Sequence, residues 1–120
     1  ALLFDAGPRW WQGGDAGQHL VLPALRALGV RRLDVLVVSH GDLDHAGGVA
    51  SVVAGMPVGL LLASEALPRD VRRVALPCGA PLAWRFDAVD FEFLGPLLGA
   101  PAATARNDRS CAMRVAGPHG

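Results

Sequence analysis

An apolar run that ends directly in a cluster of metal-ligand side chains constrains this chain more than any other feature. Leu33–Val38 is apolar and rich in valine apart from Asp34, which predicts a buried parallel strand over Leu33–Ser39. The segment Ser39–Gly48 then brings two histidines and two aspartates within six positions. Open α/β sheets build their sites at the carboxyl ends of strands. We therefore expect a functional site at the end of this strand.

The side chains of this cluster are suited to divalent cations. His40, Asp42, Asp44 and His45 offer two imidazoles and two carboxylates on one strand-to-helix loop, enough to hold one cation or two. The alternative is a helix N-terminus capped by Asp42 or Asp44, with incidental histidines. One cap needs only one carboxylate, so the spacing favours a metal site.

Length and composition are typical of one domain with a real core. The chain has 120 residues, of which 52% are hydrophobic and 18% charged, and this excludes a disordered protein. The net charge is zero, so no overall basic field indicates nucleic-acid binding, although every basic residue is arginine. No apolar run of about 18 residues predicts a membrane span. The start at Ala1, inside a predicted strand, suggests an excised domain.

The remaining patterns predict an alternating α/β order followed by a β-rich half. We expect strands over 1–5, 33–39, 58–64, 82–86, 89–94 and 110–115, and helices over 18–28 and from Val49 onward. Pro23 places the start of the regular helix near Leu22, or a kink there. Gly47 and Gly48 allow close backbone approach. Residues 65–73 are expected to form a polar surface segment, and 95–104 a loop.

Two cysteines are too few to define a disulfide framework. Cys78 lies in a turn-rich stretch and Cys111 in a predicted buried strand, with no Cys-x-x-Cys spacing between them. Free cysteine often behaves as a small buried hydrophobe, so we expect both to be unpaired. An oxidising compartment would instead permit a bridge.

The metal-ligand cluster resembles a known family signature. His40-x-Asp42-x-Asp44-His45 with Gly47-Gly48 resembles the His-x-His-x-Asp-His motif of the metallo-β-lactamase superfamily, with Asp42 in place of the second histidine. That replacement is similar to the variant in the C-terminal domain of ComEC-family channel proteins, which take up DNA during natural competence. Further stretches resemble the family in the same order, namely 2–9, 14–30 and 107–115.

The resemblance implies an α/β fold of the αββα sandwich type, two sheets flanked by helices. Residues 1–120 would be a single but incomplete domain, because the family's opening strand, its bridging aspartate and its last histidine are not found in them. Each metal would then have only two protein ligands. We therefore expect this fragment alone to bind metal weakly and to be inactive.

The resemblance also implies two divalent metal ions. His40 and Asp42 would face the first ion, and Asp44 and His45 the second. Asp42 makes the first site richer in oxygen, which favours Mn²⁺ or Mg²⁺ without excluding Zn²⁺. Asp44 is the expected catalytic residue, because it could also orient the attacking water.

Several other residues are candidates for supporting roles. Asp5 would fix a ligating histidine or the loop backbone, or else simply form a turn before Ala6-Gly7. Asp15 would cap the following turn or touch the substrate. Asn107 and Ser110 stand where many superfamily enzymes place another histidine, and are expected to contact substrate or water.

The aromatic and basic loop residues have two interpretations. Trp10 and Trp11 could stack a nucleobase, but packing in a partly buried state is the more common role of such a pair. His19 and His119 are expected at the surface. Arg9, Arg106 and Arg109 lie in predicted loops and could line a groove that leads DNA to the metal loop.

The function implied is a metal-dependent phosphodiesterase, the nuclease domain of a DNA-uptake channel that degrades the strand not imported. Its partners would be DNA, single-stranded or duplex, the rest of the membrane channel and the competence machinery. The domain would lie outside the bilayer on the periplasmic or extracellular face of the inner membrane. The alternatives are a non-catalytic DNA-guiding or structural domain with a vestigial metal loop, and another superfamily hydrolase acting on a thioester, a lactam or a small phosphodiester.

Overall fold

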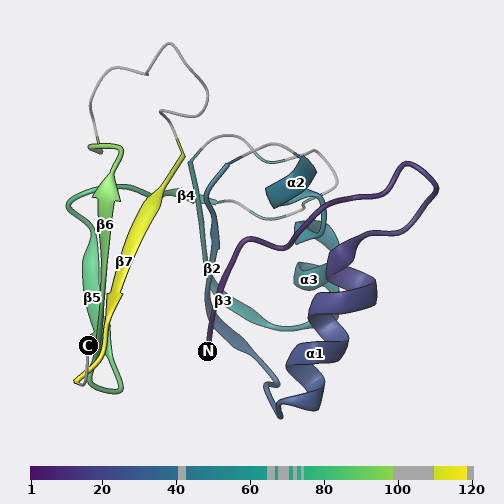
Figure 1. The fold of residues 1–120 in the computed structure, drawn as a ribbon, viewed down its shortest axis with the longest axis horizontal. Coiled ribbons are helices and arrows are strands. Elements are labelled where there is room, and N and C mark those ends of the chain that lie inside the picture. The colour runs from purple at the N-terminus through teal and green to yellow at the C-terminus, as the bar shows by residue number, and fades with distance from the viewer. Residues whose placement is uncertain are drawn as a thin grey trace.

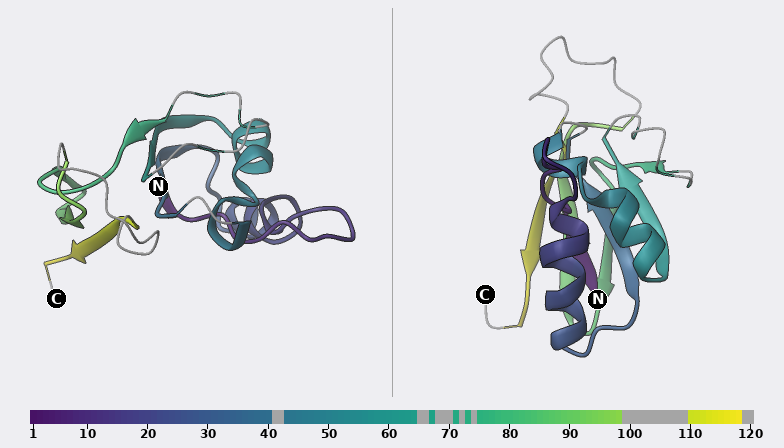
Figure 2. Two further views of the ribbon diagram at one scale, coloured as in Figure 1. Left: turned by 90° about the horizontal axis from the view of Figure 1, so that it is seen from above. Right: turned by 90° about the vertical axis from the view of Figure 1, so that its right-hand side faces the viewer.

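The computed structural model describes most of the chain, in two sheets and a helical layer (Figure 1). It describes residues 1–40, 43–64, 67, 71, 73, 75–98 and 110–118, with the backbone alone at Leu43 and Asp44. The three layers follow one another as helices, a parallel sheet and an antiparallel sheet, and Figure 2 shows the same order from above.

The parallel sheet contains four strands in the order β1-β2-β3-β4. They are β1 (Leu2–Phe4), β2 (Leu33–Val38), β3 (Val58–Ala63) and β4 (Leu76–Pro77). The first three confirm the predicted strands to within a residue or so at each end. The two-residue β4 was not predicted, because so short a run has no readable period. Its Pro77 is tolerated since β4 is an edge strand.

The helices connect these strands and lie on one face of the sheet (Figure 1). A π-helical segment, η1 (Gly17–Val21), leads into α1 (Leu22–Ala27), while α2 (Leu43–Ala46) and α3 (Val49–Gly55) follow β2. The predicted start of regular helix near Leu22 is confirmed. Pro23 lies in the first turn of α1. Its ring would clash with a regular α-helical turn directly before it, and the π-helical segment η1 occupies that place.

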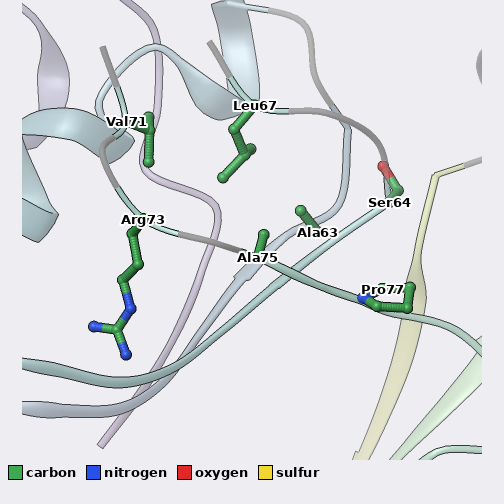
Figure 3. A pocket seen from close by; sticks show the side chains of 7 residues that line it. All are labelled: Ala63, Ser64, Leu67, Val71, Arg73, Ala75 and Pro77. Atoms are coloured by element: carbon green, nitrogen blue, oxygen red, sulfur yellow. The ribbon is translucent and has the colours of Figure 1, made fainter. Parts of the chain in front are cut away.

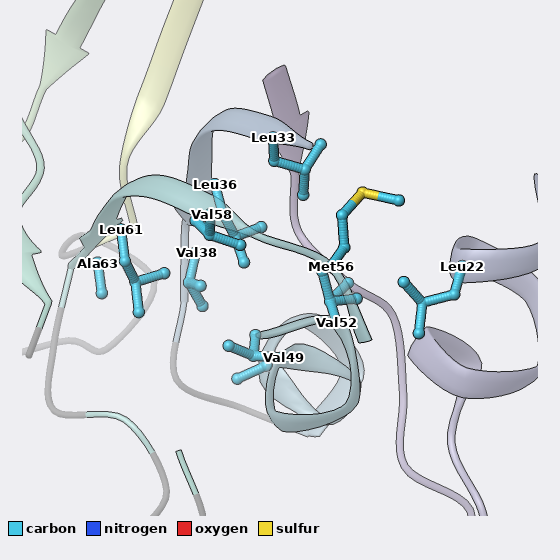
Figure 4. Packing of buried hydrophobic residues seen from close by; sticks show 12 residues of the cluster. Leu22, Leu33, Leu36, Val38, Val49, Val52, Met56, Val58, Leu61 and Ala63 are labelled. Carbon is cyan, nitrogen blue, oxygen red and sulfur yellow. The ribbon is translucent and has the colours of Figure 1, made fainter. Parts of the chain in front are cut away.

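The main core fills the space between this helical layer and the sheet (Figure 4). Leu36 and Val38 of β2 meet Val49 and Val52 of α3 there, and all four are fully or almost fully buried. Each such side chain contributes about 1.5–3 kcal/mol when removed from water. This packing explains the helical spacing of the valines after Gly48.

The segment expected to be a polar surface is only partly described, and its apolar members do not fit that expectation. Leu67 and Val71 pack against the main core. Arg73 donates hydrogen bonds to the carbonyl oxygens of Val58 and Gly59, which holds the segment beside β3. Its remaining polar residues, at 65, 69, 70 and 72, lie outside the described residues.

The antiparallel sheet has the order β5-β6-β7 and confirms the predicted β-rich half. It consists of β5 (Ala83–Phe86), β6 (Val89–Gly95) and β7 (Ala112–Ala116). Asp87 and Ala88 join β5 to β6 with φ angles of 51° and 63°, the left-handed pair that matches strand twist in a tight hairpin. This sheet covers the face of the parallel sheet opposite the helices (Figures 1 and 2).

A second core cluster and a disulfide join the two sheets. Val37 and Leu62 of the parallel sheet pack with Phe93 of β6, and Cys78 is bonded to Cys111 in the same cluster. The expectation of two unpaired cysteines is therefore wrong. The partners are 33 residues apart in sequence. They meet because the end of β4 lies beside the start of β7, so no local spacing could indicate the bridge.

The expected mixed α/β sandwich with two sheets is confirmed. All of its described helices lie on one side of it, against the parallel sheet. None of the helices in the described part of the chain is long and apolar enough to span a bilayer.

Candidate metal centre

The candidate site lies where three parallel strands end. The register pairs β1 with β2 and β2 with β3 in parallel, so their carboxyl ends meet at one edge of the sheet. Asp5 follows β1, Ser39 and His40 follow β2, and Ser64 follows β3. The Ser64 N–H donates to the Val38 carbonyl oxygen at 3.2 Å, which keeps the carboxyl ends of β2 and β3 together.

Asp5 organises this edge through its carboxylate. Its Oδ1 accepts a hydrogen bond from the Ser39 N–H at 2.7 Å, and its Oδ2 accepts one from the Ser39 hydroxyl at 2.7 Å. Oδ2 also lies 2.9 Å from Nδ1 of His45. The backbone of Asp5 is left-handed, with a φ of 62°, a conformation that aspartate tolerates better than most residues. Asp5 therefore contacts both the loop backbone and a histidine of the cluster.

The two histidines of the cluster lie next to each other. Their ring centroids are 5.7 Å apart with the ring planes tilted by 56°. His40 is 4% exposed, whereas the His45 side chain is 45% exposed. Since His45 Nδ1 faces Asp5, its Nε2 is the ring nitrogen left to meet a ligand.

The two aspartates of the motif are the next residues to consider. Asp42 and the side chain of Asp44 lie outside the described residues, although the backbone of Asp44 belongs to α2. Among the side chains that are described, no group of three or more possible metal ligands gathers at one point. The convergence of all four motif residues thus stays a prediction.

The residues present nevertheless fit a divalent cation. A histidine whose Nδ1 contacts a carboxylate is the usual arrangement of a metal-ligating imidazole, because the carboxylate fixes the ring and raises its basicity. His45 has this arrangement through Asp5, and the His40 ring lies beside it. The donor set of the motif, two imidazoles and two carboxylates, is one that binds Zn²⁺ and Mn²⁺.

Gly48 fits the loop tightly against the segment that follows β1 and Asp5. A Cβ atom at Gly48 would lie 2.2 Å from the Ala6 carbonyl oxygen. The N–H of Gly48 donates to Gly7 at 3.1 Å, and the N–H of Ala6 donates to the His45 carbonyl at 3.0 Å. The expected close backbone approach is confirmed for Gly48, and any side chain there would separate these segments.

Asp15 contacts the helical layer with both carboxylate oxygens. Oδ1 accepts a hydrogen bond from the Gln18 N–H at 2.9 Å, and Oδ2 accepts one from the Ser51 hydroxyl at 2.6 Å. The first contact caps the turn that leads into η1, as predicted, and the second ties this turn to α3. A substrate contact by Asp15 stays a prediction.

The remaining candidate residues lie partly within and partly outside the described part of the chain. Ser110 lies just before Cys111, partly buried, and Asn107, Arg106, Arg109 and His119 lie outside the described residues. His19 is exposed, as expected. Trp10 packs on His19 with ring centroids 5.6 Å apart, so partial packing is confirmed for it. Trp11 is 92% exposed, and packing is the wrong interpretation there.

Two residues that support the loop were not assigned from the sequence. Ser39 is 6% exposed and contacts Asp5 with its N–H and its hydroxyl. The Cys111 N–H donates to the Ser39 carbonyl oxygen at 2.9 Å, so the disulfide borders the loop. A serine directly after a predicted central strand was the available signal for Ser39, while nothing local indicated Cys111.

A pocket of about 320 Å³ opens beside the end of β3 (Figure 3). It is lined by Ala63, Ser64, Leu67, Val71, Arg73, Ala75 and Pro77. The Ser64 hydroxyl has no hydrogen-bond partner among the described residues. Because the lining includes neither His40 nor His45, we keep this pocket separate from the candidate metal centre.

Comparisons with known proteins agree with this geometry. The chain is 40% identical over 114 residues to Competence protein ComA of Neisseria gonorrhoeae. These residues make up 95% of this chain and 15% of that protein. It is 31% identical over 115 residues to Recombination protein 2 of Haemophilus influenzae, covering 95% of this chain and 14% of that protein. Uncharacterized protein YcaI of Escherichia coli is 31% identical over 115 residues, covering 96% of this chain and 14% of that protein.

The chain thus spans about one-seventh of the length of these curated relatives, 14–15%. No solved structure matches it. The similarity to Competence protein ComA confirms the resemblance to ComEC-family proteins. The model of the metallo-beta-lactamase superfamily matches residues 1–102. The parallel strands that lead to Asp5 and His40 lie within the matched residues. Because the match covers most of its length, the chain belongs to the metallo-β-lactamase superfamily.

Proposed function

We propose that residues 1–120 belong to a metal-dependent phosphodiesterase domain of a DNA-uptake channel, which hydrolyses the strand that is not imported. The observation that carries this proposal is the 2.9 Å contact between Asp5 and His45 Nδ1, with the buried His40 ring beside it. A carboxylate that orients an imidazole at the end of a parallel strand is suited to holding a catalytic metal.

His40, Asp42, Asp44 and His45 would hold two divalent cations, Mn²⁺ or Zn²⁺, with Mg²⁺ as a further candidate. When bound, such cations polarise a phosphoryl oxygen and lower the pKa of a shared water towards neutrality. The protein's own contribution is to fix the ligands. Asp5 holds His45 and, through Ser39, the start of the loop, so the imidazoles do not have to reorganise during the reaction.

Asp44 is the proposed catalytic residue. As a carboxylate on α2, one residue before His45, it would accept a hydrogen bond from the attacking water and orient it towards phosphorus. Asp15, Asn107 and Ser110 are proposed to contact the DNA strand or a bound water. Ser110 precedes the Cys111 whose N–H contacts Ser39, and Asn107 stands three positions before Ser110 in the sequence.

The proposed location is the periplasmic or extracellular side of the inner membrane, as one domain of a longer channel protein. The Cys78–Cys111 disulfide supports this placement, because such bonds persist in oxidising compartments and are rare in the cytosol. The relatives named for competence and recombination support DNA as the substrate. The remaining membrane channel and the competence machinery would be its partners.

The test is cleavage of labelled DNA by the natural full-length protein carrying Asp44→Asn. We expect loss of metal-dependent cleavage with an unchanged fold, because a charged loop ligand is removed and no core side chain. Asp90→Asn is the matched control, since Asp90 is an exposed carboxylate on β6, and it should cleave at the wild-type rate.

Three outcomes decide between the candidate functions. Cleavage by Asp44→Asn at the wild-type rate, with Mn²⁺ or Zn²⁺ added, would mean that the two-metal assignment with Asp44 as catalytic residue is wrong. DNA binding without cleavage by the wild-type protein would favour a guiding domain with a vestigial metal loop. Hydrolysis of thioesters, lactams or small phosphodiesters in place of DNA would indicate a different superfamily hydrolase.

A further inference from the structure

The segment between β1 and η1 forms an ordered hairpin that the proposed reaction does not use. Arg9 and Asp15 form an antiparallel bridge. The Ala16 N–H donates to Pro8 at 2.8 Å, and the Trp10 N–H donates to Gly14 at 3.0 Å. These hydrogen bonds close a short turn over residues 10–14, and they fix the backbone at its tip.

The two tryptophans of this hairpin have different environments. Trp10 stacks on His19, with an interplanar angle of 23°. Gly14 permits this arrangement, because a Cβ there would lie 2.7 Å from Nε2 of His19 and because its φ is +83°. Trp11 is 92% exposed at the tip. An ordered turn thus presents a large aromatic ring to solvent, which costs hydrophobic free energy unless a ligand covers the ring.

The hairpin starts at the candidate metal centre. Its first strand continues from Ala6, whose N–H donates to the His45 carbonyl at 3.0 Å, and from Gly7, which accepts a hydrogen bond from Gly48 at 3.1 Å. Figures 1 and 2 show the hairpin passing α2 and extending outward from the helical side of the domain. A polymer bound at the metal loop could therefore reach the tip of the hairpin.

We propose that Trp11 stacks on an unpaired base of a single-stranded nucleic acid whose backbone runs to the metal centre. This inference rests on the proposed function and specifies its substrate class. A stacking ring needs a free base face, and in a duplex each base face is covered by its neighbours, so the ligand is single-stranded. The neighbours of Trp11 favour a polar, charged ligand over an apolar one, because Arg9 and Gln12 are exposed beside it.

The test is oligonucleotide binding by the natural full-length protein without added metal, so that nothing is cleaved. Fluorescence anisotropy would compare labelled oligothymidine, an abasic strand of the same length and charge, and a duplex. Trp11→Ala should weaken oligothymidine binding about tenfold, since stacking on an aromatic ring contributes about 1–3 kcal/mol per base. Binding of the abasic strand should not change, and Trp11→Phe should restore most of the affinity.

The control is Leu20→Ala, which removes another exposed apolar side chain, 60% exposed on η1. It should bind oligothymidine like the wild type. Wild-type affinity of Trp11→Ala for oligothymidine, or an equal loss on the abasic strand, would overturn the stacking role. The stacking role would also be overturned if Trp11→Ala changed the binding of another protein and left oligothymidine binding unchanged.

The outcome is independent of the test of the proposed function. Asp44→Asn reports on cleavage and Trp11→Ala on base-dependent binding. If Trp11 proves neutral while Asp44→Asn abolishes cleavage, the stacking role fails and the nuclease stands. If Trp11→Ala weakens binding while Asp44→Asn cleaves normally, the two-metal assignment and the role of Asp44 fail, and the strand-binding hairpin stands.

Discussion

The parallel sheet and the antiparallel sheet bury their side chains in different ways. β2 and β3 are covered on both faces, by the helices through Leu36 and by β6 through Val37. The antiparallel sheet is covered on one face, and the other carries paired charges, with Arg85 bonded to Asp90 and Arg114 to Glu92. A doubly covered sheet offers a rigid base for a site, whereas a singly covered one leaves the side chains of its outer face in solvent.

The difference extends to the chemistry. Parallel strands all bring their carboxyl ends to one edge, and that edge carries Asp5 and His40. Antiparallel strands alternate in direction, so the polar residues of β5, β6 and β7 are spread over a face and no edge collects them. In the described part of the chain, the contact of this half with the site is made just before β7, where the Cys111 N–H donates to the Ser39 carbonyl oxygen.

The largest effect on stability should come from removing the bridge between the sheets. Replacing Cys78 and Cys111 by alanine frees a segment of 33 residues in the unfolded chain, which by the chain-entropy estimate costs about 4 kcal/mol. Urea unfolding of the domain, with and without reductant, measures this cost. Equal unfolding midpoints for the bridged and the reduced protein would mean that the sheets hold together without the bond.

The next largest effect on the free energy of unfolding should be seen in the doubly covered sheet and not in the singly covered one. Leu36→Ala should destabilise the domain by about 2–5 kcal/mol, because it leaves a cavity at a fully buried position. Leu94→Ala on β6, where the side chain is 62% exposed, should change stability by about 0.5 kcal/mol or less. Comparable losses in the two variants, seen in the same urea experiment, would remove the distinction between the sheets.

The sequence predicted the doubly covered sheet more completely than its surroundings. The apolar runs that became β2 and β3 are long and bounded by turn residues, so their type and position were readable. The strand β4 has two residues and no pattern. Trp11 was misread as packed, because sequence spacing does not show which way a loop side chain points.

For the site, the sequence predicted the motif and the two possible roles of Asp5. It could not choose between them, since the choice depends on β1 pairing with β2 and bringing Asp5 within 2.9 Å of His45. It also could not indicate the disulfide or the contact of Cys111 with Ser39, which arise only when the two sheets pack. Contacts between distant segments have no local signature.

A smaller effect is expected where the parallel sheet supports the metal loop. Asp5→Asn keeps the size of the side chain but removes its charge, so His45 loses its carboxylate partner. Metal affinity should fall about 10–100-fold, as for other outer partners of metal-ligating histidines. Isothermal titration of the natural full-length protein with Mn²⁺ and Zn²⁺ measures this, with Asp90→Asn as the matched carboxylate control. Unchanged affinity in Asp5→Asn would leave Asp5 a turn residue only.

The smallest effect belongs to the charged outer face of the antiparallel sheet. Arg85 donates two hydrogen bonds to Asp90, at 2.7 and 3.0 Å, and these lower the pKa of Asp90 below its usual value of 3.8. A carboxylate with a lowered pKa stabilises the folded state above that usual value, and the contribution is lost as the pH falls through the folded pKa. Because the pair is exposed, Asp90→Asn should cost little stability at neutral pH. Urea unfolding at pH 7 and pH 3 should show the wild type and Asp90→Asn drawing closer together at the lower pH. A difference that grows on acidification would mean that the pair does not act through the charge of Asp90.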